Sequence, residues 1–256
     1  MSRILALITI LLACAVPARA EQLITSLSTH RVLITSNFTG AELILFGSIE
    51  RDAETVSRPG GYDLVVTVLG PRQTIVTRRK DRILGIWANT DSLTFPDAPA
   101  YLAVRTNRPV EEIADAATLQ RLQVGLANIA LPSAPGEDAA SNARSDAFRS
   151  AFLRLKVQQG HYRERANAVT FLTPTLFRAT IPLPADVPIG TYEIDLKLFA
   201  AGAMVTRESN AFEIVKVGFE QFVAHVAQTH GFFYGLATAA MAMLTGWLAS
   251  VAFRRD

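Results

Sequence analysis

The sequence predicts a mainly β protein, with an immunoglobulin-like β-sandwich, a second, smaller β-rich region, an intervening helical segment and one C-terminal transmembrane helix. Short runs rich in Val, Ile, Leu, Phe and Thr recur at roughly 8–12-residue spacing in the first half of the chain, as in β-sandwiches. Apolar and polar residues alternate again after residue 168. Residues 231–253 form a stretch of 23 residues without a charge. As a helix, that stretch would cross a hydrocarbon core of about 30 Å.

The first 20 residues have the pattern of a cleaved signal peptide. Arg3 precedes an apolar stretch at residues 4–16, and Ala18-Arg19-Ala20 is an A-x-A cleavage site. The only cysteine, Cys14, lies in this stretch, so cleavage leaves a mature chain without cysteine. Acylation of Cys14, as in a lipoprotein, is the alternative, although Leu12 is bulky for the position two before such a cysteine.

Cleavage also changes the charge balance of the chain. The sequence has 25 basic and 23 acidic residues, and the first 20 residues contain two of the basic ones and no acid. The mature chain is therefore close to neutral. A nucleic-acid-binding protein carries a clear basic excess, so the charge balance argues against that class.

Residues 21–107 are predicted to form the β-sandwich domain. Turn residues such as Pro59-Gly60-Gly61 and Gly70-Pro71 separate short apolar runs, although the Cys-Trp-Cys pattern of true immunoglobulin domains is absent. The expected strands are residues 32–36, 41–49, 62–69, 73–77, 84–88, 92–95 and 100–105.

Residues 108–160 are predicted to form a helical connector with an exposed loop. Asn107 or Asp115 is expected to cap a short helix that ends at Leu122. Residues 131–142 are small, polar and contain Pro and Gly, which favours an exposed loop. An amphipathic helix is expected over residues 145–157, with one apolar face that comprises Phe148, Ala151, Phe152 and Leu155.

Residues 161–217 are predicted to form the second β-rich domain, with its apolar face covered by the preceding helix or by the first domain. In the clearest strand, Tyr192, Ile194, Leu196 and Leu198 are expected to face inward. Their neighbours Glu193, Asp195 and Lys197 are expected to face outward. A hairpin turn is expected at Ala201-Gly202, followed by a last strand over residues 212–217.

Residues 218–230 are predicted to form a juxtamembrane helix that leads into a transmembrane helix at 231–253. Arg254 and Arg255 then place the tail, residues 254–256, in the cytoplasm by the positive-inside rule, and the body in the periplasm. A stripe of small residues recurs along the helix every three or four positions. Such a stripe lets another helix approach closely, although alanine-rich helices also produce one by chance. The stripe comprises Gly235, Ala239, Ala242, Gly246 and Ser250.

One dense basic cluster, Arg78-Arg79-Lys80-Asp81-Arg82, is followed closely by Trp87. Arg79, Lys80 and Trp87 are the candidates for contact with a partner or an anion, such as an oxyanion, a lipid phosphate or an acidic protein surface. The alternative is a solvated hairpin tip without a function. His30 and His161 are candidates to meet a carboxylate in space, but no metal-binding, nucleotide-binding or hydrolase motif is present in the sequence.

Several phrases of the chain resemble those of the putative transmembrane protein family of alpha-proteobacteria. These are VLITSNFTGAELILFGSIE, RRKDRILGIWAN, LFRATIPLPADVPIGTYEIDLKLF, GFEQFV and the terminal GWLASVAFRRD. The resemblance implies an inner-membrane protein that faces the periplasm, and it implies no catalytic residue. It also carries an expectation of association with sulfite-exporter-type permeases, which no residue of this chain indicates.

Together these observations predict a non-enzymatic, single-pass inner-membrane protein that is an accessory or interaction subunit of another membrane protein, such as a transporter. The expected partners are the lipid bilayer and, through the transmembrane helix, another membrane protein or a second copy. No catalytic residue, cofactor or metal ligand is assigned. The alternative is a periplasmic module that binds or senses a small anion or a metal ion in the cleft between the two β regions.

Overall fold

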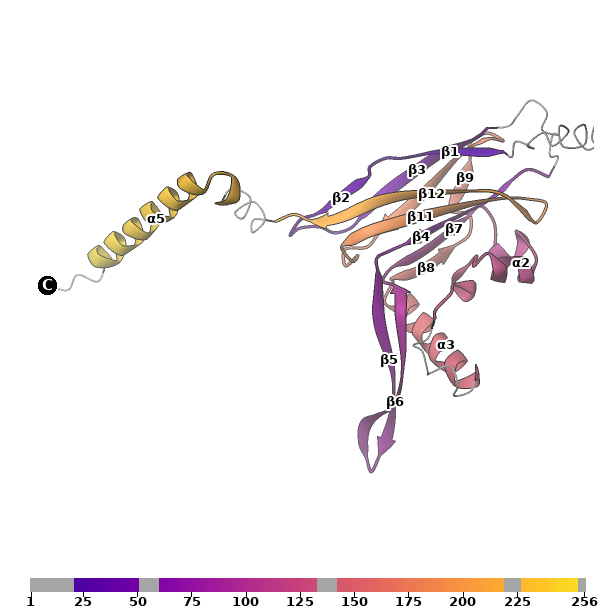
Figure 1. Ribbon diagram of the computed structural model, residues 1–256, viewed down its shortest axis with the longest axis horizontal. Coiled ribbons are helices and arrows are strands. Elements are labelled where there is room, and N and C mark those ends of the chain that lie inside the picture. The colour runs from indigo at the N-terminus through magenta and orange to yellow at the C-terminus, as the bar shows by residue number, and fades with distance from the viewer. Residues whose placement is uncertain (1–20, 51–59, 133–141, 219–226, 253–256) are drawn as a thin grey trace, which may run out of the picture.

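A computed structural model describes residues 21–50, 60–132, 142–218 and 227–252 (Figure 1). The predicted signal peptide at 1–20, most of the predicted loop and juxtamembrane helix, and the cytoplasmic tail lie outside these residues. The fold is mainly β, as predicted. Its strands are β1 (Gln22–Leu27), β2 (Arg31–Ile34), β3 (Ala41–Glu50), β4 (Asp63–Leu69), β5 (Arg72–Ile83), β6 (Ile86–Pro99), β7 (Leu102–Thr106), β8 (Tyr162–Arg165), β9 (Val169–Phe171), β10 (Leu176–Leu183), β11 (Gly190–Ala200) and β12 (Ala203–Lys216). Its helices are η1 (Val110–Glu112), α2 (Ala116–Arg121), η2 (Leu126–Asn128), α3 (Asn142–Gln158) and α5 (Gly231–Ala252).

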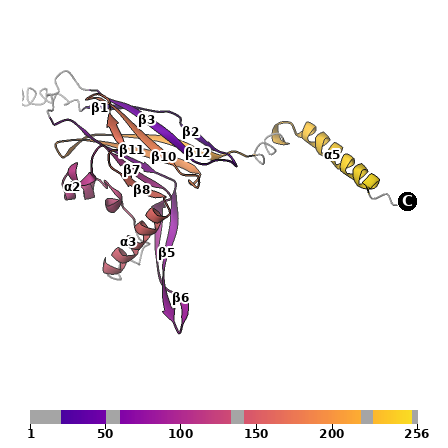
Figure 2. The ribbon, with the colours of Figure 1, turned by 180° about the vertical axis from the view of Figure 1, so that it is seen from behind.

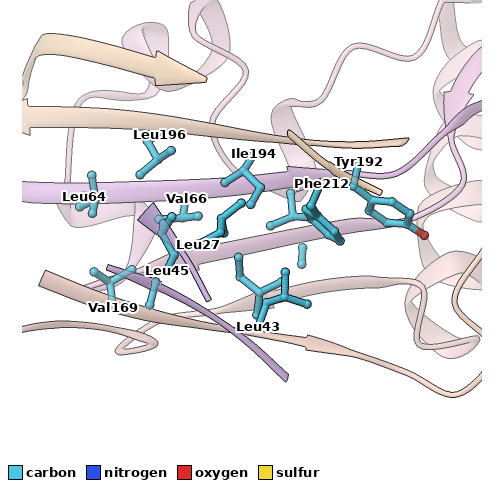
Figure 3. Packing of buried hydrophobic residues seen from close by; sticks show 14 of the residues in the cluster. Leu27, Leu43, Leu45, Leu64, Val66, Val169, Tyr192, Ile194, Leu196 and Phe212 are labelled. Atoms are coloured by element: carbon cyan, nitrogen blue, oxygen red, sulfur yellow. The ribbon is translucent and has the colours of Figure 1, made fainter. Parts of the chain in front are cut away.

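Two sheets pack face to face as a sandwich. The four-stranded sheet has the order β1-β3-β10-β9, and the six-stranded sheet has the order β2-β12-β11-β4-β7-β8. Leu43 and Leu45 of β3 face Val66 of β4 and Ile194 of β11 across one hydrophobic core (Figure 3). Each of these side chains is at most 1% exposed. Burial of such side chains is the main term that holds the sheets together, at about 1.5–3 kcal/mol for each.

The order of the strands is that of a variable-type immunoglobulin sandwich. Such domains place strands A, B, E and D in one sheet and G, F, C and C′ in the other. Here β1, β3, β10 and β9 take the first set of places, and β12, β11, β4 and β7 take the second. The hairpin β5–β6 is inserted between β4 and β7, and the helical connector between β7 and β8.

The prediction of a separate second β domain is wrong. Strands from residues 161–217 pair directly with strands from residues 21–107, as in the pairs β3–β10 and β4–β11. Both regions therefore contribute to each of the two sheets. The local alternation that predicts a strand contains no information about which distant strand will pair with it, and this explains the error.

A tyrosine at the start of β11 closes the corner that leads into this strand. The hydroxyl of Tyr192 donates to the carbonyl oxygen of Pro188 at 2.6 Å. Immunoglobulin-like sandwiches have the same arrangement, the tyrosine corner, at the start of strand F. Gly190 lies between the two residues with a φ of 138°, which a side chain would strain. The sequence P-x-G-x-Y therefore codes for this corner.

The inserted strands β5 and β6 form one long hairpin that leaves the sandwich and reaches beyond α3 (Figures 1 and 2). The three short strands predicted at 73–77, 84–88 and 92–95 are thus two long ones, because the charged residues 78–82 continue β5. Near the sandwich, Phe95 of β6 packs against Phe152 of α3, with ring centroids 5.0 Å apart. Phe148 and Phe152 are buried as predicted, whereas Leu155 is exposed.

The connector between β7 and β8 covers the outer face of the six-stranded sheet. As predicted, Asp115 caps α2, and its carboxylate accepts from the backbone N–H of Thr118 at 3.4 Å. Ile113 and Leu119 pack on Val65 and Phe199 of the sheet. This cover buries Asp195 and Lys197, which are 3% and 5% exposed and form an ion pair with each other. Both side chains lie on the outward face of β11, as predicted, but the connector covers that face, so charge at these positions does not indicate exposure.

Helix α5 lies apart from the two sheets in both views (Figures 1 and 2). It spans 22 residues, Gly231–Ala252, close to the predicted bounds of 231–253. Within the residues that the structure describes, no helix combines the length and the hydropathy that a membrane crossing requires.

Candidate functional site

The tip of the β5–β6 hairpin has an unusual turn. Leu84 and Gly85 are its two central residues, with φ angles of 50° and 87°. Two positive φ values define a type I′ turn, for which Asn-Gly is the preferred sequence. A leucine with this backbone conformation costs roughly 1–2 kcal/mol. Leu84 is also 99% exposed, so no packing within the described residues compensates for that cost.

Apolar side chains gather around this turn. Ile83 and Ile86 flank it as the last pair of the ladder, and Trp87 follows. Ile86 and Trp87 are 72% and 67% exposed. We call Ile83, Leu84, Ile86 and Trp87 the hairpin tip. An exposed group of large apolar residues on a protruding element marks a contact surface more often than isolated apolar residues do.

The basic residues behind the hairpin tip lie on two different faces of the hairpin. Side chains along a strand alternate between faces, and paired residues of neighbouring strands share a face. Arg82 pairs with Trp87 in the ladder, so Lys80, Arg82 and Trp87 share one face. Arg79 belongs to the opposite face, where its guanidinium lies 3.1 Å from the carboxylate of Asp81. Of the three predicted contact residues, the structure brings together Lys80 and Trp87 and separates Arg79 from them.

Helix α3 holds the middle of the hairpin. Arg144 of this helix forms an ion pair of 2.5 Å with Asp91 of β6 and donates to the carbonyl oxygen of Ser92. The hydrogen bond from Arg144 holds the pKa of the Asp91 carboxyl below its ordinary value. A hydrogen bond from Thr90 does the same for Asp81. Both acids are therefore charged at neutral pH and matched by arginines, and the positive charges of Lys80 and Arg82 stay on the face of Trp87.

The small residues of helix α5 form a second candidate surface. Gly235, Ala239, Ala242, Gly246 and Ser250 are all exposed. A Cβ atom added at Gly235 or Gly246 would meet nothing within 4 Å. The predicted stripe is thus unoccupied by other described residues, and large apolar side chains such as Leu236 and Trp247 are exposed on the same helix.

A third candidate is a cleft of about 980 Å³ where β8 approaches β9 and β10. Three arginines, Arg105, Arg163 and Arg165, line it. Arg105 is 3% exposed, and its Nε has no hydrogen-bond partner among the described residues. Burial lowers the pKa of Arg105, and the positive charges of Arg165 and Arg163 lower it further against an opposing effect of Tyr101.

The histidines do not form a metal site in the described part of the chain. Nε2 of His161 lies 3.1 Å from a carboxylate oxygen of Asp186. No group of three His, Cys, Asp or Glu residues that could hold a metal ion occurs among the described residues. A convergence of His30 with His161 and a carboxylate, which the sequence allows, is thus not found there.

Comparison with known families identifies a match that covers most of the chain. The family described as "Putative transmembrane protein (Alph_Pro_TM)" matches residues 22–255. The chain belongs to this family. The match covers nearly all of the predicted mature chain, and therefore the hairpin tip, the arginine cleft and α5 are all parts of the Alph_Pro_TM region. No curated protein matches the chain.

Sequence reasoning missed the arginine cleft. Arg105 ends the apolar run Leu102-Ala103-Val104, and Arg163 and Arg165 stand two apart in a short strand of this Alph_Pro_TM chain. A charged residue that continues the buried face of a predicted strand, as Arg105 does, indicates a candidate binding site. The parallel pairing of β7 with β8, which joins the three arginines, is not visible in the sequence because 55 residues separate the two strands.

Proposed function

We propose that the chain is a non-enzymatic, single-pass inner-membrane protein that serves as an accessory or interaction subunit of another membrane protein. Membership of the putative transmembrane family supports the membrane location. The uncharged sequence 231–253 supports a helix that anchors the chain, and α5 already exposes apolar side chains along its length. A helix that is apolar all round is typical of a buried or lipid-exposed element.

The orientation follows from the charges at the two ends of the sequence. Arg254 and Arg255 directly follow the proposed anchor, which favours a cytoplasmic C-terminus. Cleavage after Ala20 would release the new N-terminus on the other side of the membrane. The sandwich would then lie in the periplasm, held by its membrane anchor, with the hairpin free to contact a partner.

The hairpin tip is the observation that carries the interaction. Leu84 adopts a strained backbone conformation and is 99% exposed, although Asn would suit the turn better. Strained and exposed residues gather at functional sites, because a contact elsewhere compensates for the strain. The tip offers Trp87 on the face that also carries Lys80 and Arg82, with Ile83 and Ile86 on the opposite face. Aromatic residues and arginine are enriched at protein interfaces. The small-residue stripe of α5 provides a second contact, within the membrane, for the same partner or for a second copy.

The proposal is tested by site-specific photo-crosslinking of the full chain in its native membrane. A photoreactive side chain at position 84 is expected to give a discrete protein adduct, and one at position 242 is expected to give an adduct within the membrane. Leu172, which is 51% exposed on the sandwich, serves as the matched control position and is expected to give none. Absence of a protein adduct at position 84 would contradict a protein partner at the tip.

Two charge reversals sharpen the same experiment. Lys80→Glu should lower the yield of the adduct at position 84 at least roughly fivefold, since it places a negative charge beside Trp87 in the contact. Arg79→Glu is the matched control, because Arg79 lies on the opposite face and already pairs with Asp81. Equal loss in both variants would show that the face of Trp87 is not the contact surface.

A further inference from the structure

The arginine cleft lies between the edges of the two sheets, away from the hairpin tip. Strand β8 is an edge strand of the six-stranded sheet, and β9 is an edge strand of the four-stranded sheet. The cleft is lined by residues of β7, β8, β9 and β10 and by the end of α3. A ligand bound in this cleft would therefore not touch the surfaces proposed for membrane and partner contact, and the inference does not depend on them.

The three arginines project to the same side of the six-stranded sheet. Strands β7 and β8 are parallel, with Ala103 paired to Arg163 and Arg105 paired to Arg165. Paired residues share a face, and Ala103 is part of the core between the sheets. The guanidinium groups of Arg105, Arg163 and Arg165 are therefore directed toward the space beside the core, from strands about 4.8 Å apart.

Arg105 lacks the partner that a buried charge requires. It is 97% buried, given its exposed fraction of 3%. Its Nε makes no hydrogen bond to the described residues, and its guanidinium forms no ion pair with a carboxylate among them. A buried cation without a counter-ion is strongly destabilising, and two more cations beside it add repulsion. Such a group is retained where something else supplies the negative charge.

The carboxylates near the cleft do not supply this negative charge. Glu164 alternates with the two arginines along β8, so its side chain belongs to the opposite face of the strand. There it accepts the backbone N–H of Leu126 at 2.7 Å. Glu42 is exposed on the rim of the cleft. Of the three arginines, Arg163 donates from Nε to the carbonyl oxygen of Gly160 at 2.8 Å, which leaves the rest of its guanidinium fork for a ligand.

We infer that this cleft binds a small oxyanion of the phosphate or sulfate type between Arg105, Arg163 and Arg165. Guanidinium forks bind such anions through two parallel N–H···O bonds each, and three forks match a tetrahedral dianion better than a single carboxylate. The same chemistry would bind a free anion or the phosphate of a lipid headgroup, and the experiment separates these two sources.

The inference is tested by calorimetric titration of the full chain in detergent with inorganic phosphate and with sulfate. Chloride at the same ionic strength is the blank, and a short-chain phosphatidic acid tests the headgroup as a source. Saturable binding of phosphate, sulfate or the lipid phosphate supports the site, and chloride alone should not bind. With phosphate about a hundredfold above its Kd, the midpoint of thermal unfolding should rise by roughly 5 °C or more.

Variants locate the binding. Arg105→Met and Arg165→Gln should each weaken phosphate binding at least about tenfold, because each removes charge-assisted hydrogen bonds. Arg31→Met is the matched control, since Arg31 is an exposed arginine on β2, at the opposite edge of the same sheet. In phosphate-free buffer, Arg105→Met should unfold at no lower temperature than the unsubstituted chain, because it removes an unmatched charge.

Arg165→Gln keeps the test decisive if Arg105→Met fails to fold, since Arg165 is exposed. Absence of saturable binding of phosphate, sulfate and lipid phosphate would overturn the inference. Equal weakening by Arg31→Met would overturn it too, because binding would then reflect general positive charge.

Discussion

Leu84 shows how one residue can conflict with its own backbone. The type I′ turn requires positive φ at both central positions, and the φ of Leu84 is 50°. Glycine at the second position meets the requirement without strain, whereas leucine at the first does not. Because the leucine side chain is almost fully exposed, folding alone gives no reason for its presence. The proposed contact with a partner would account for it.

At the residue scale, Leu84→Asn should stabilise the hairpin while it weakens the contact. Asparagine tolerates the left-handed conformation, so the gain should be about 1 kcal/mol. Amide hydrogen exchange of the hairpin residues around the turn should therefore slow roughly fivefold. Ile86→Asn is the matched control, because it removes a similar apolar surface without a positive φ, and it should not slow exchange. Faster exchange in Leu84→Asn would show that the turn is not strained.

At the scale of elements, three buried tyrosines connect strands to neighbouring segments. Each hydroxyl donates to the carbonyl oxygen of a proline: Tyr101 to Pro182, Tyr162 to Pro99 and Tyr192 to Pro188, at 2.6–2.7 Å. The bond from Tyr101, the residue directly before β7, reaches β10 and so joins the two sheets. Burial raises the pKa of all three tyrosines, most strongly for Tyr162 and Tyr192.

This burial predicts how stability depends on pH. The unfolded chain releases tyrosine protons near pH 10, whereas the folded chain holds them to higher pH. The unfolded state then binds fewer protons than the folded state, so stability is full below about pH 10 and falls as pH rises further. Thermal unfolding in detergent between pH 8 and pH 11 measures this loss.

The variant Tyr192→Phe separates tyrosine ionisation from other groups that titrate at high pH. It should be less stable at pH 8 by about 1 kcal/mol, through loss of the bond to Pro188. Its stability should then fall less steeply above pH 10 than that of the unsubstituted chain. An equal slope in the two proteins would mean that Tyr192 does not contribute to the alkaline loss.

Individual strands are predictable from the sequence because their signals are local. The alternation after residue 168, the clearest strand at residues 192–198 and the turn at Ala201-Gly202 all match the structure, as in β10, β11 and the β11–β12 turn. The hairpin β5–β6 is harder to predict, because charged residues such as Arg78 suggest a turn although a partner strand can hold them in a solvated ladder. The burial of Asp195 and Lys197 is hard to predict for a related reason: the Asp195 carboxylate pairs with both Lys197 and Arg207, so these charges are matched beneath the connector.

The candidate sites show the same division between local and distant information. The basic cluster and Trp87 are adjacent in sequence, so their proximity could be predicted. Their distribution over two faces depends on strand register and could not. The tip turned out to be apolar, at Ile83, Leu84 and Ile86, with the basic residues behind it. The arginine cleft needs the pairing of β7 with β8, which is set only when the whole sandwich forms.

At the scale of the whole molecule, the β-sandwich is followed by a helix that does not contribute to its hydrophobic core. The core between the sheets is filled by residues of the strands themselves, and α5 contributes none of the residues in the three core clusters. Helix α5 instead exposes apolar residues and lies apart from the sandwich (Figure 2). Because exposed apolar surface of this extent is unfavourable in water, the account requires that lipid surrounds residues 231–253.

The two tryptophans of the chain allow a direct test of this requirement. Trp87 lies in the hairpin tip and Trp247 lies in α5, so Trp87→Phe leaves Trp247 as the sole tryptophan. The full chain with this substitution is reconstituted into vesicles whose lipids carry bromine on their acyl chains, and Trp247 fluorescence is measured. The account predicts strong quenching relative to unbrominated vesicles, because bromine quenches tryptophan only at contact within the hydrocarbon. Unquenched Trp247 emission, with the protein bound to the vesicles, would contradict membrane anchoring by this helix.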